Sequence, residues 1–185
     1  QTLLMAESSV FGSSAADFRR NGEKRYVKTL FHGAYRREVF EKAGLFNENL
    51  GRTEDNEIHY RIRQAGYKIC LCPDVISYQH TRSSLSKMLK QKYSNGYWVG
   101  RTEKICPGCL SLYHIVPFAF VMAMAGAILL GFLSWIFPVL FFGLYFAAAI
   151  LMTVPAIKNQ NNFHPLYLTL PVLFFLLHTF YGVGT

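Results

Sequence analysis

The sequence predicts two unlike parts, a mixed α/β polar part before Pro107 and an α-helical membrane part after it. Hydrophobic residues make up 51% of the 185 residues, and aromatic residues make up 16%. Nearly all Arg, Lys, Asp and Glu lie before Pro107, and Lys158 is the only such residue after it. Because a soluble domain carries roughly 25% charged residues, the charge-poor part is expected in lipid.

Short helices and strands are predicted in the polar part. Gly44 and Gly66 each end a segment whose apolar residues recur at helical spacing. The Pro73-Asp74 turn separates two stretches rich in β-forming residues. The predicted elements are helices over 34–43 and 54–65 and strands over 67–71 and 75–78.

A longer amphipathic helix is predicted over 84–104. Its apolar side chains share one face, and most of its lysines lie off that face. The residues of this face are Leu85, Met88, Leu89, Tyr93 and Tyr97. The pattern suits a helix at the membrane interface beneath the polar part of the chain, or an amphipathic helix that packs on an ordinary core.

Three apolar runs follow, over 110–133, 135–154 and 165–185. The first two are close to the roughly 20 residues that cross a bilayer, and they predict a helical hairpin. The third contains Pro171, His178 and two glycines, so it is predicted either to span or to form a broken, re-entrant or interfacial segment.

The basic residues predict an orientation. Five on the predicted 84–104 helix precede the first run, namely Lys87, Lys90, Lys92, Arg101 and Lys104, and Lys158 follows the second. The positive-inside rule then places both flanks in the cytoplasm. The formal net charge of +8 does not predict nucleic acid binding, because the sequence contains no nucleic-acid module. Anionic lipid is the expected partner of these basic residues.

An acidic pair, Glu54-Asp55, follows Thr53 at the start of the predicted 54–65 helix. A helix N-terminus favours negative charge, so Asp55 is expected to be ionised at neutral pH and able to accept a proton. Thr53 is also a good N-cap, and acidic residues in a first turn are ordinary at helix starts. Spacing alone therefore leaves both a catalytic and a structural interpretation open.

The order of several motifs from Phe31 to His80 favours the catalytic interpretation of the acidic pair. These are Gly-x-x-Arg-Arg-x-x-Phe (33–40), Gly-Leu-Phe-Asn-Glu (44–48), Thr-Glu-Asp (53–55), Arg-x-x-x-Ala-Gly-Tyr (61–67) and Tyr-x-His (78–80). Together they resemble the C-terminal half of the catalytic domain of family 2 glycosyltransferases, especially the membrane-bound exopolysaccharide enzymes of the succinoglycan type. The resemblance implies a GT-A, Rossmann-like fold. The implied division is an acceptor-side half over 1–83, an interfacial helix over 84–106 and a transmembrane region over 107–185.

The resemblance also implies a reaction, in which an inverting transferase moves a sugar from a nucleotide-sugar donor to a lipid-linked or glycan acceptor. Asp55 would be the general base, and Glu54 would shape the acceptor site. A divalent metal, Mg²⁺ or Mn²⁺, would stabilise the leaving diphosphate. His80 is the candidate metal ligand, with a hydrogen-bonded structural role as its alternative. The enzyme would lie in the inner or plasma membrane as a multi-pass protein with its catalytic part in the cytoplasm.

Three further residues are candidates for substrate binding. Gly33 belongs to the first motif, and Arg82 is either a diphosphate ligand or a solvated charge. Gln91 occupies the first position of the Gln-x-x-Arg-Trp motif of processive relatives, but Ser94 and Asn95 replace its Arg and Trp. The absence of this Arg and Trp predicts transfer of one sugar at a time rather than processive polymerisation.

Four cysteines raise a metal alternative. Cys70 and Cys72 share a strand face, and Cys106 and Cys109 have the spacing of a zinc knuckle. The first pair lacks the usual two-residue gap, so reduced cysteines are the default expectation and a four-cysteine zinc site is the alternative.

No Asp-x-Asp motif occurs in the sequence. Because these transferases use that motif in a preceding nucleotide-binding half, the chain is expected to be an internal fragment that is inactive alone. Two alternatives are a non-catalytic membrane subunit that retains the acceptor-side shell, and a membrane transport or scaffold protein. Against transport, only His114 and His178 within the apolar runs titrate near neutral pH.

Overall fold

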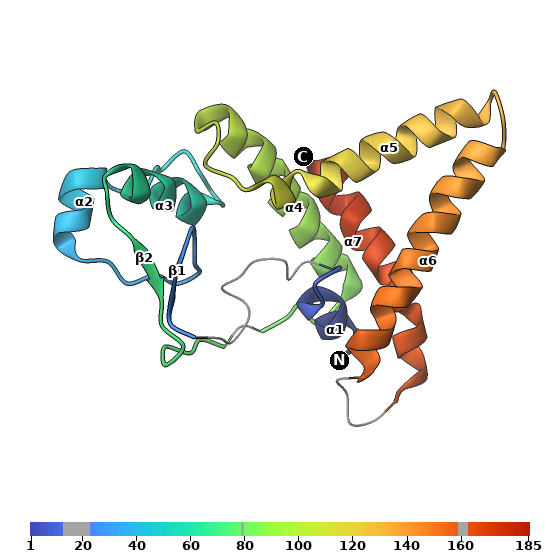
Figure 1. Cartoon of the computed structure of the whole chain (residues 1–185), viewed down its shortest axis with the longest axis horizontal. Coiled ribbons are helices and arrows are strands. Elements are labelled where there is room, and N and C mark those ends of the chain that lie inside the picture. The colour runs from blue at the N-terminus through green and yellow to red at the C-terminus, as the bar shows by residue number, and fades with distance from the viewer. Residues whose placement is uncertain (13–22, 79, 159–162) are drawn as a thin grey trace.

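The computed structural model describes residues 1–12, 23–78, 80–158 and 163–185. These residues form two groups of elements (Figure 1). A small unit contains a two-stranded sheet and two short helices. A larger helical unit contains α1 (Thr2–Ser8), α4 (Leu85–Ile105) and the apolar helices. The described part of the chain is therefore mostly helical, with α/β character confined to the small unit.

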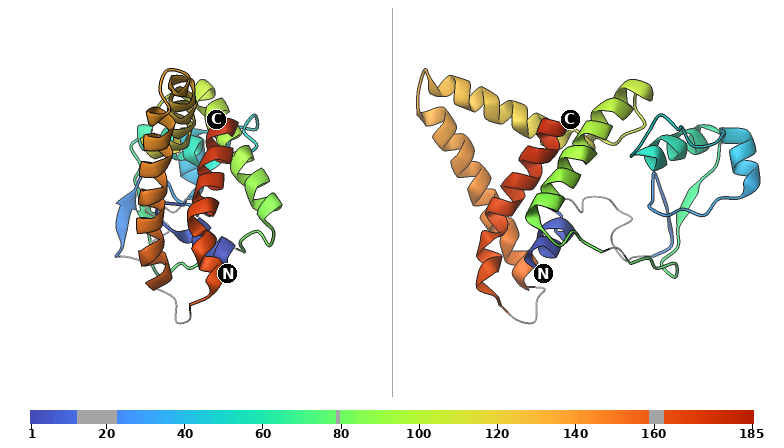
Figure 2. Two further views of the ribbon diagram at one scale, coloured as in Figure 1. Left: turned by 90° about the vertical axis from the view of Figure 1, so that its right-hand side faces the viewer. Right: turned by 180° about the vertical axis from the view of Figure 1, so that it is seen from behind.

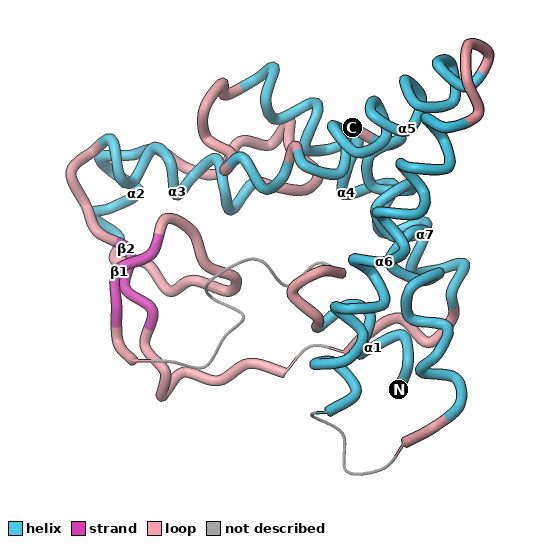
Figure 3. The backbone as a smooth tube through the Cα atoms, turned by 45° about the vertical axis from the view of Figure 1, so that its right-hand side comes forward, coloured by secondary structure: helices cyan, strands magenta, loops and turns pink. Residues whose placement is uncertain are grey.

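The small unit is built on an antiparallel pair of strands. β1 (Arg25–Val27) pairs with β2 (Ile69–Leu71), with Tyr26 opposite Cys70. The helices α2 (Arg37–Ala43) and α3 (Glu54–Gln64) lie at one end of the strands (Figure 3). The core beneath them is formed by the buried side chains of Val39, Ile58, Ile62 and Ile69. Burial of these aliphatic groups holds the start of α3 in place.

Predictions for the small unit are partly confirmed. Helix α3 agrees with the predicted 54–65 helix to within one residue, but α2 begins at Arg37 rather than at 34, because Arg36 has an extended backbone (φ −72°, ψ 146°). The strand predicted over 67–71 shortens to β2. The strand predicted over 75–78 is wrong. Those residues pair with no strand in the part of the chain that the structure describes, and Tyr78 is 91% exposed.

Helix α4 agrees with the predicted 84–104 helix, and the Ser84 side chain caps it by accepting the Lys87 amide at 3.4 Å. The predicted apolar face is only partly correct. Tyr93 and Tyr97 are exposed, and the buried face consists of Met88, Lys92, Gly96, Val99 and Thr102. The small size of Gly96 determines which face of α4 packs on α7, because a Cβ at this position would collide with the Tyr181 carbonyl at the end of α7. The helices approach most closely where side chains are smallest, which counting apolar residues does not predict.

Three apolar helices complete the larger unit (Figure 2). They are α5 (Val116–Gly131), α6 (Ile136–Lys158) and α7 (Leu170–Gly184), the last preceded by a 3₁₀ turn, η3 (Pro165–Thr169). Among the described residues, Ile136–Lys158 and Pro165–Gly184 are long and apolar enough to cross a membrane, whereas α5 has 16 residues. The first run is shorter than predicted, because a separate 3₁₀ turn, η2 (Leu112–His114), precedes α5.

The third apolar segment is continuous rather than broken. Pro171 lies in the first turn of α7, where the missing N–H has no intrahelical partner to lose. His178 within α7 is hydrogen-bonded through both ring nitrogens, to the Tyr145 hydroxyl at 2.9 Å and to the Phe11 carbonyl at 2.6 Å. These contacts join α6, α7 and the chain after α1. The core of the unit consists of Met5, Ala6, Met88, Ala149, Tyr167, Leu170, Leu173, Phe174 and Leu177.

Candidate functional site

The Glu54-Asp55 pair lies at the first turn of α3, as the sequence predicts. The residue before the pair has an unusual backbone, because Thr53 is left-handed with φ 63°. A residue with a branched Cβ rarely adopts this conformation, which costs roughly 1–2 kcal/mol. Thr53 occupies the N-cap position, as predicted, but its side chain makes no capping hydrogen bond to the helix.

Asp55 is held by its neighbour and is partly buried. One carboxylate oxygen, Oδ1, accepts the Asn56 backbone N–H at 2.8 Å and the Asn56 side-chain amide at 3.2 Å. Burial raises the pKa of Asp55 above its ordinary 3.8, and the like charge of Glu54 raises it further, while the backbone hydrogen bonds lower it. Burial therefore outweighs the acid-stabilising effect expected of a helix N-terminus. A carboxylate with a raised pKa is a stronger proton acceptor.

Helix α4 supports the loop that leads to this pair. Three consecutive loop residues contact α4 at positions three and four apart along the helix, and hence on one face. The contacts are Gly51 against the Trp98 ring, Arg52 Nη1 to Asn95 Oδ1 at 2.7 Å, and Thr53 Oγ1 to Thr102 Oγ1. Trp98 lies so close that a Cβ at Gly51 would be 2.6 Å from its ring. Sequence reasoning missed Trp98 and Thr102.

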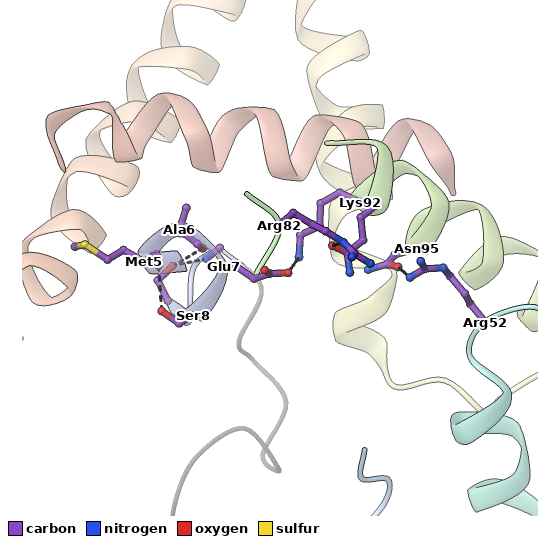
Figure 4. A network of polar contacts seen from close by, with 11 residues as sticks. Met5, Ala6, Glu7, Ser8, Arg52, Arg82, Lys92 and Asn95 are labelled. Atoms are coloured by element: carbon purple, nitrogen blue, oxygen red, sulfur yellow. Dashed lines mark hydrogen bonds and ion pairs between the residues drawn. The ribbon is translucent and has the colours of Figure 1, made fainter. Parts of the chain in front are cut away.

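A buried lysine of α4 also reaches the N-terminal helix, α1 (Figure 4). Lys92 Nζ is 3.0 Å from Glu7 Oε1, and the two side chains are only 5% and 14% exposed. Arg82 Nε donates to Gln91 Oε1 at 3.2 Å. The structure thus brings together the predicted substrate-binding residues Arg82 and Gln91, and it places Lys92, predicted to be an interfacial cation, in an internal ion pair.

His59 lies one turn after Asp55 on α3 and is completely buried. Its Nδ1 bonds the Thr29 hydroxyl at 2.9 Å, and its Nε2 bonds the Tyr35 hydroxyl at 2.6 Å. Burial, and secondarily the nearby Arg63 charge, lowers the pKa of His59 to about 4, so the ring is neutral at physiological pH. His59 therefore fixes the chain after β1 to α3. The spacing of four residues between Asp55 and His59 could have indicated from the sequence that both lie on one face of the helix, but the prediction did not include His59.

Tyr35 connects this histidine to the acidic pair. Burial raises the pKa of Tyr35, and the negative charge of Asp55 raises it further. Tyr35 also lines a cavity of about 820 Å³ together with the predicted Gly33. A Cβ at Gly33 would lie 2.6 Å from the Tyr35 hydroxyl oxygen, so a larger residue there would displace the Tyr35 ring.

An internal ion pair anchors the far side of α3. Glu57 is buried and accepts two bonds from Arg61, at 2.6 Å to Nε and 2.8 Å to Nη2. Arg61 also donates to the carbonyls of Ala43 and Leu45, at the end of α2. The side-chain bond to Glu57 raises the pKa of Arg61, which stays charged. This arrangement fixes α3 against the Gly44 turn.

The described residues do not fit a divalent metal site. No group of three or more His, Cys, Asp or Glu side chains that could hold a metal occurs among them. His80 is exposed, and its metal role stays a prediction, since one histidine would be only one of the several ligands that such a site needs. The four-cysteine zinc alternative fails for the same reason within the described ranges: Cys70 and Cys72 have sulfurs 3.9 Å apart, but the four cysteines do not meet.

A protein-family model matches the segment that contains the Glu54-Asp55 pair. Residues 16–97 match the family model described as glycosyltransferase like family 2. This segment is similar to family 2 glycosyltransferases. The resemblance inferred from the motifs is thereby confirmed, and a match to family 2 implies a GT-A fold for the matched segment.

Relatives of this family 2 sequence act in glycan biosynthesis. The dolichyl N-acetyl-alpha-D-glucosaminyl phosphate 3-beta-D-2,3-diacetamido-2,3-dideoxy-beta-D-glucuronosyltransferase of Methanococcus voltae is 26% identical over 173 residues, which cover 93% of this chain and 50% of that protein. Succinoglycan biosynthesis protein ExoA of Rhizobium meliloti is 27% identical over 169 residues, 87% of this chain and 48% of that protein.

A third relative matches the polar part. The O-antigen chain rhamnosyltransferase WbaN of Salmonella anatum is 35% identical over 80 residues, which cover 43% of this chain and 25% of that protein. The chain spans about half the length of the first two relatives. No solved structure matches the chain.

Proposed function

We propose that this chain works in a membrane-bound, inverting glycosyltransferase that transfers a sugar from a nucleotide-sugar donor to a lipid-linked or glycan acceptor. The observation that supports this most is Asp55, a half-buried carboxylate with a raised pKa at the start of α3, inside the family 2 segment. The names of the relatives, two glycosyltransferases and a succinoglycan biosynthesis protein, favour the same reaction class.

Asp55 acts as the general base in this proposal. It takes the proton of the acceptor hydroxyl while that oxygen attacks the anomeric carbon, and the bond to the diphosphate breaks with its electron pair leaving on the nucleotide. Glu54 has a different role, because adjacent residues on a helix point about 100° apart. It shapes the acceptor side and, through its charge, keeps the pKa of Asp55 high.

The remaining predicted residues act on substrate position. Gly33 lines the 820 Å³ cavity beside Tyr35, and Gln91 and Arg82 bond each other at the N-terminal half of α4. Asn95, which replaces the Trp of the processive motif, bonds Arg52 before the acidic pair. Since this position serves the loop rather than presenting an aromatic ring, the contact favours transfer of a single sugar.

The surface of the apolar helices supports a membrane location. Large apolar side chains of α5 and α6 are exposed, including Leu129 at 67%, Leu144 at 70% and Leu151 at 69%. A soluble monomer rarely exposes so extensive an apolar surface. We place these helices in the inner or plasma membrane and the small unit in the cytoplasm, where the exposed basic residues of α4 and Lys158 face anionic lipid.

The test is release of nucleoside diphosphate from a panel of sugar nucleotides, in membranes that contain the full-length protein. Asp55→Asn is expected to lower release by about 10²- to 10⁴-fold while donor binding persists. Asp74→Asn removes an equivalent carboxylate from an exposed turn and is the matched control, which retains activity.

Two results would contradict the proposal. Equal rates for Asp55→Asn and Asp74→Asn would remove Asp55 from the mechanism. Absence of release with every donor, from a folded and membrane-inserted protein, would favour a non-catalytic subunit.

A further inference from the structure

A second cavity, of about 400 Å³, opens beside Asn56. It lies where three segments meet: the chain after β1, the middle of α3, and the 106–115 loop that follows α4 and returns toward α3 (Figure 1). Its lining includes Lys28, Asn56, Arg63, Gly108, Ser111 and Tyr113. We name it the Lys28–Arg63 cavity. It carries two cationic side chains and no Asp or Glu in its lining.

The two cationic side chains of this cavity form no ion pair with the described residues. Arg63 Nε is buried and has no hydrogen-bond partner in the structure. The ion pairs among the described residues include neither Lys28 nor Arg63, and Arg63 instead lies over the Tyr60 ring at 5.7 Å. A buried donor without a partner costs roughly 1–3 kcal/mol, and more when it is charged. Such a group calls for an anion that accepts its hydrogen bonds.

The cavity is fixed by contacts that do not depend on a ligand. His59 bonds Thr29, the residue after Lys28, at 2.9 Å, and so ties that segment to α3. Asn56 and Arg63 are two helical turns apart, hence on the same face of α3. In the loop wall, the Gly108 N–H donates to Glu103 Oε1 at 3.2 Å, and Gly108 has the positive φ of 80° that the turn requires. The walls are thus preorganised.

The cavity adjoins the proposed base on one side and apolar surface on the other. Asn56 lines it and donates its side-chain amide to Asp55 at 3.2 Å. On the other side, the lining residue Leu112 is 85% exposed, and the chain from it continues directly into α5, where Val116 is 61% exposed. A ligand that fits both sides has an anionic group near the cations and a hydrocarbon tail along the loop and α5.

We propose that the Lys28–Arg63 cavity binds the phosphate or diphosphate of a lipid-linked acceptor, with the lipid tail leaving over Leu112 toward α5. The inference rests on the proposed function, because it orients the acceptor hydroxyl toward Asp55. Arg63 is suited to the task, since its guanidinium donates several hydrogen bonds in a fixed plane to phosphate oxygens. The donor diphosphate is a second source of the same chemistry, and the experiment separates the two.

The first arm measures binding without turnover. Full-length protein in detergent is titrated with a short-chain isoprenyl phosphate, the matching isoprenol, inorganic phosphate and a nucleoside diphosphate. Lys28→Gln and Arg63→Gln are each expected to weaken binding of the isoprenyl phosphate by about tenfold or more, the loss of a charged hydrogen bond, and to leave binding of the nucleoside diphosphate unchanged. Lys90→Gln and Arg37→Gln remove exposed charges and are the matched controls.

The second arm measures KM for the lipid-phosphate acceptor and for the donor in the same variants. A rise in acceptor KM with unchanged donor KM supports the proposal. Weaker binding of the nucleoside diphosphate, with the isoprenyl phosphate unaffected, would assign the cavity to the donor and overturn it. Isoprenyl phosphate binding equal to that of the controls in both variants would also overturn it. Loss of turnover in Asp55→Asn with phosphate binding intact separates failure of this site from failure of the proposed base.

Discussion

The contact between Thr53 and Thr102 gives the sharpest prediction, because it joins a strained residue before the acidic pair to a fully buried hydroxyl on α4. Thr53 has φ 63°, and Thr102 is 0% exposed. The left-handed conformation costs about 1–2 kcal/mol. Thr102→Val removes the hydrogen bond between the two hydroxyls, worth about 0.5–1.5 kcal/mol, while Thr53 Oγ1 keeps its bond to the Arg52 carbonyl. The energy of this hydrogen bond is similar to the strain at Thr53. Thr102→Val is therefore expected to lower the population of the left-handed Thr53 conformation that positions Asp55.

The expected effect is a fall in kcat of about 2- to 13-fold, since 1.36 kcal/mol corresponds to tenfold. Val keeps the shape of Thr, so the packing of α4 on α7 is retained. The assay is steady-state nucleoside diphosphate release by full-length protein, with circular dichroism to verify folding. Thr53→Gly supplies a second variant, because glycine adopts positive φ without strain.

A double-mutant cycle then decides the question. In the Thr53→Gly background, Thr102→Val is expected to have little further effect on kcat, because neither the strain nor the hydrogen bond remains. An unchanged kcat in Thr102→Val alone would refute the positioning role. The same fold-reduction in both backgrounds would also refute it, since Thr102 would then act independently of Thr53.

Two other predictions concern α3. Glu54→Gln removes the like charge that raises the pKa of Asp55, so that pKa falls. Because Asp55 must be ionised to accept a proton, the acid limb of the kcat/KM profile should move to lower pH, and an unmoved limb would contradict the coupling. Glu57→Gln leaves the half-buried Arg61 without its carboxylate and should lower the free energy of unfolding by about 1.5–3 kcal/mol in denaturant titrations. Glu41→Gln breaks an exposed pair, worth about 0–1 kcal/mol, and is its control; equal losses in the two variants would be evidence against the anchoring role.

Local sequence signals predicted what depends on neighbouring residues. The bounds of α3, the extent of α4 and the positions of α6 and α7 follow from glycine placement and apolar periodicity. The 75–78 strand was predicted wrongly for a related reason, since β-forming residues make a strand only where a partner is available. The buried face of α4 was predicted only in part, because Gly96 rather than an apolar side chain sets the closest approach to α7.

The sequence by itself determined the division into a charged and an apolar part, the family, and the place of Asp55 at a helix start. Only the tertiary structure decided which groups surround that helix. Thr102 lies 49 residues from Thr53, and the 106–115 loop closes a cavity against Arg63, so neither contact has a local signature. The physical reason is that periodicity reports which face of a segment is apolar, whereas the packing of α4 on α7 and the hydrogen bonds of the buried His59 select which segments meet.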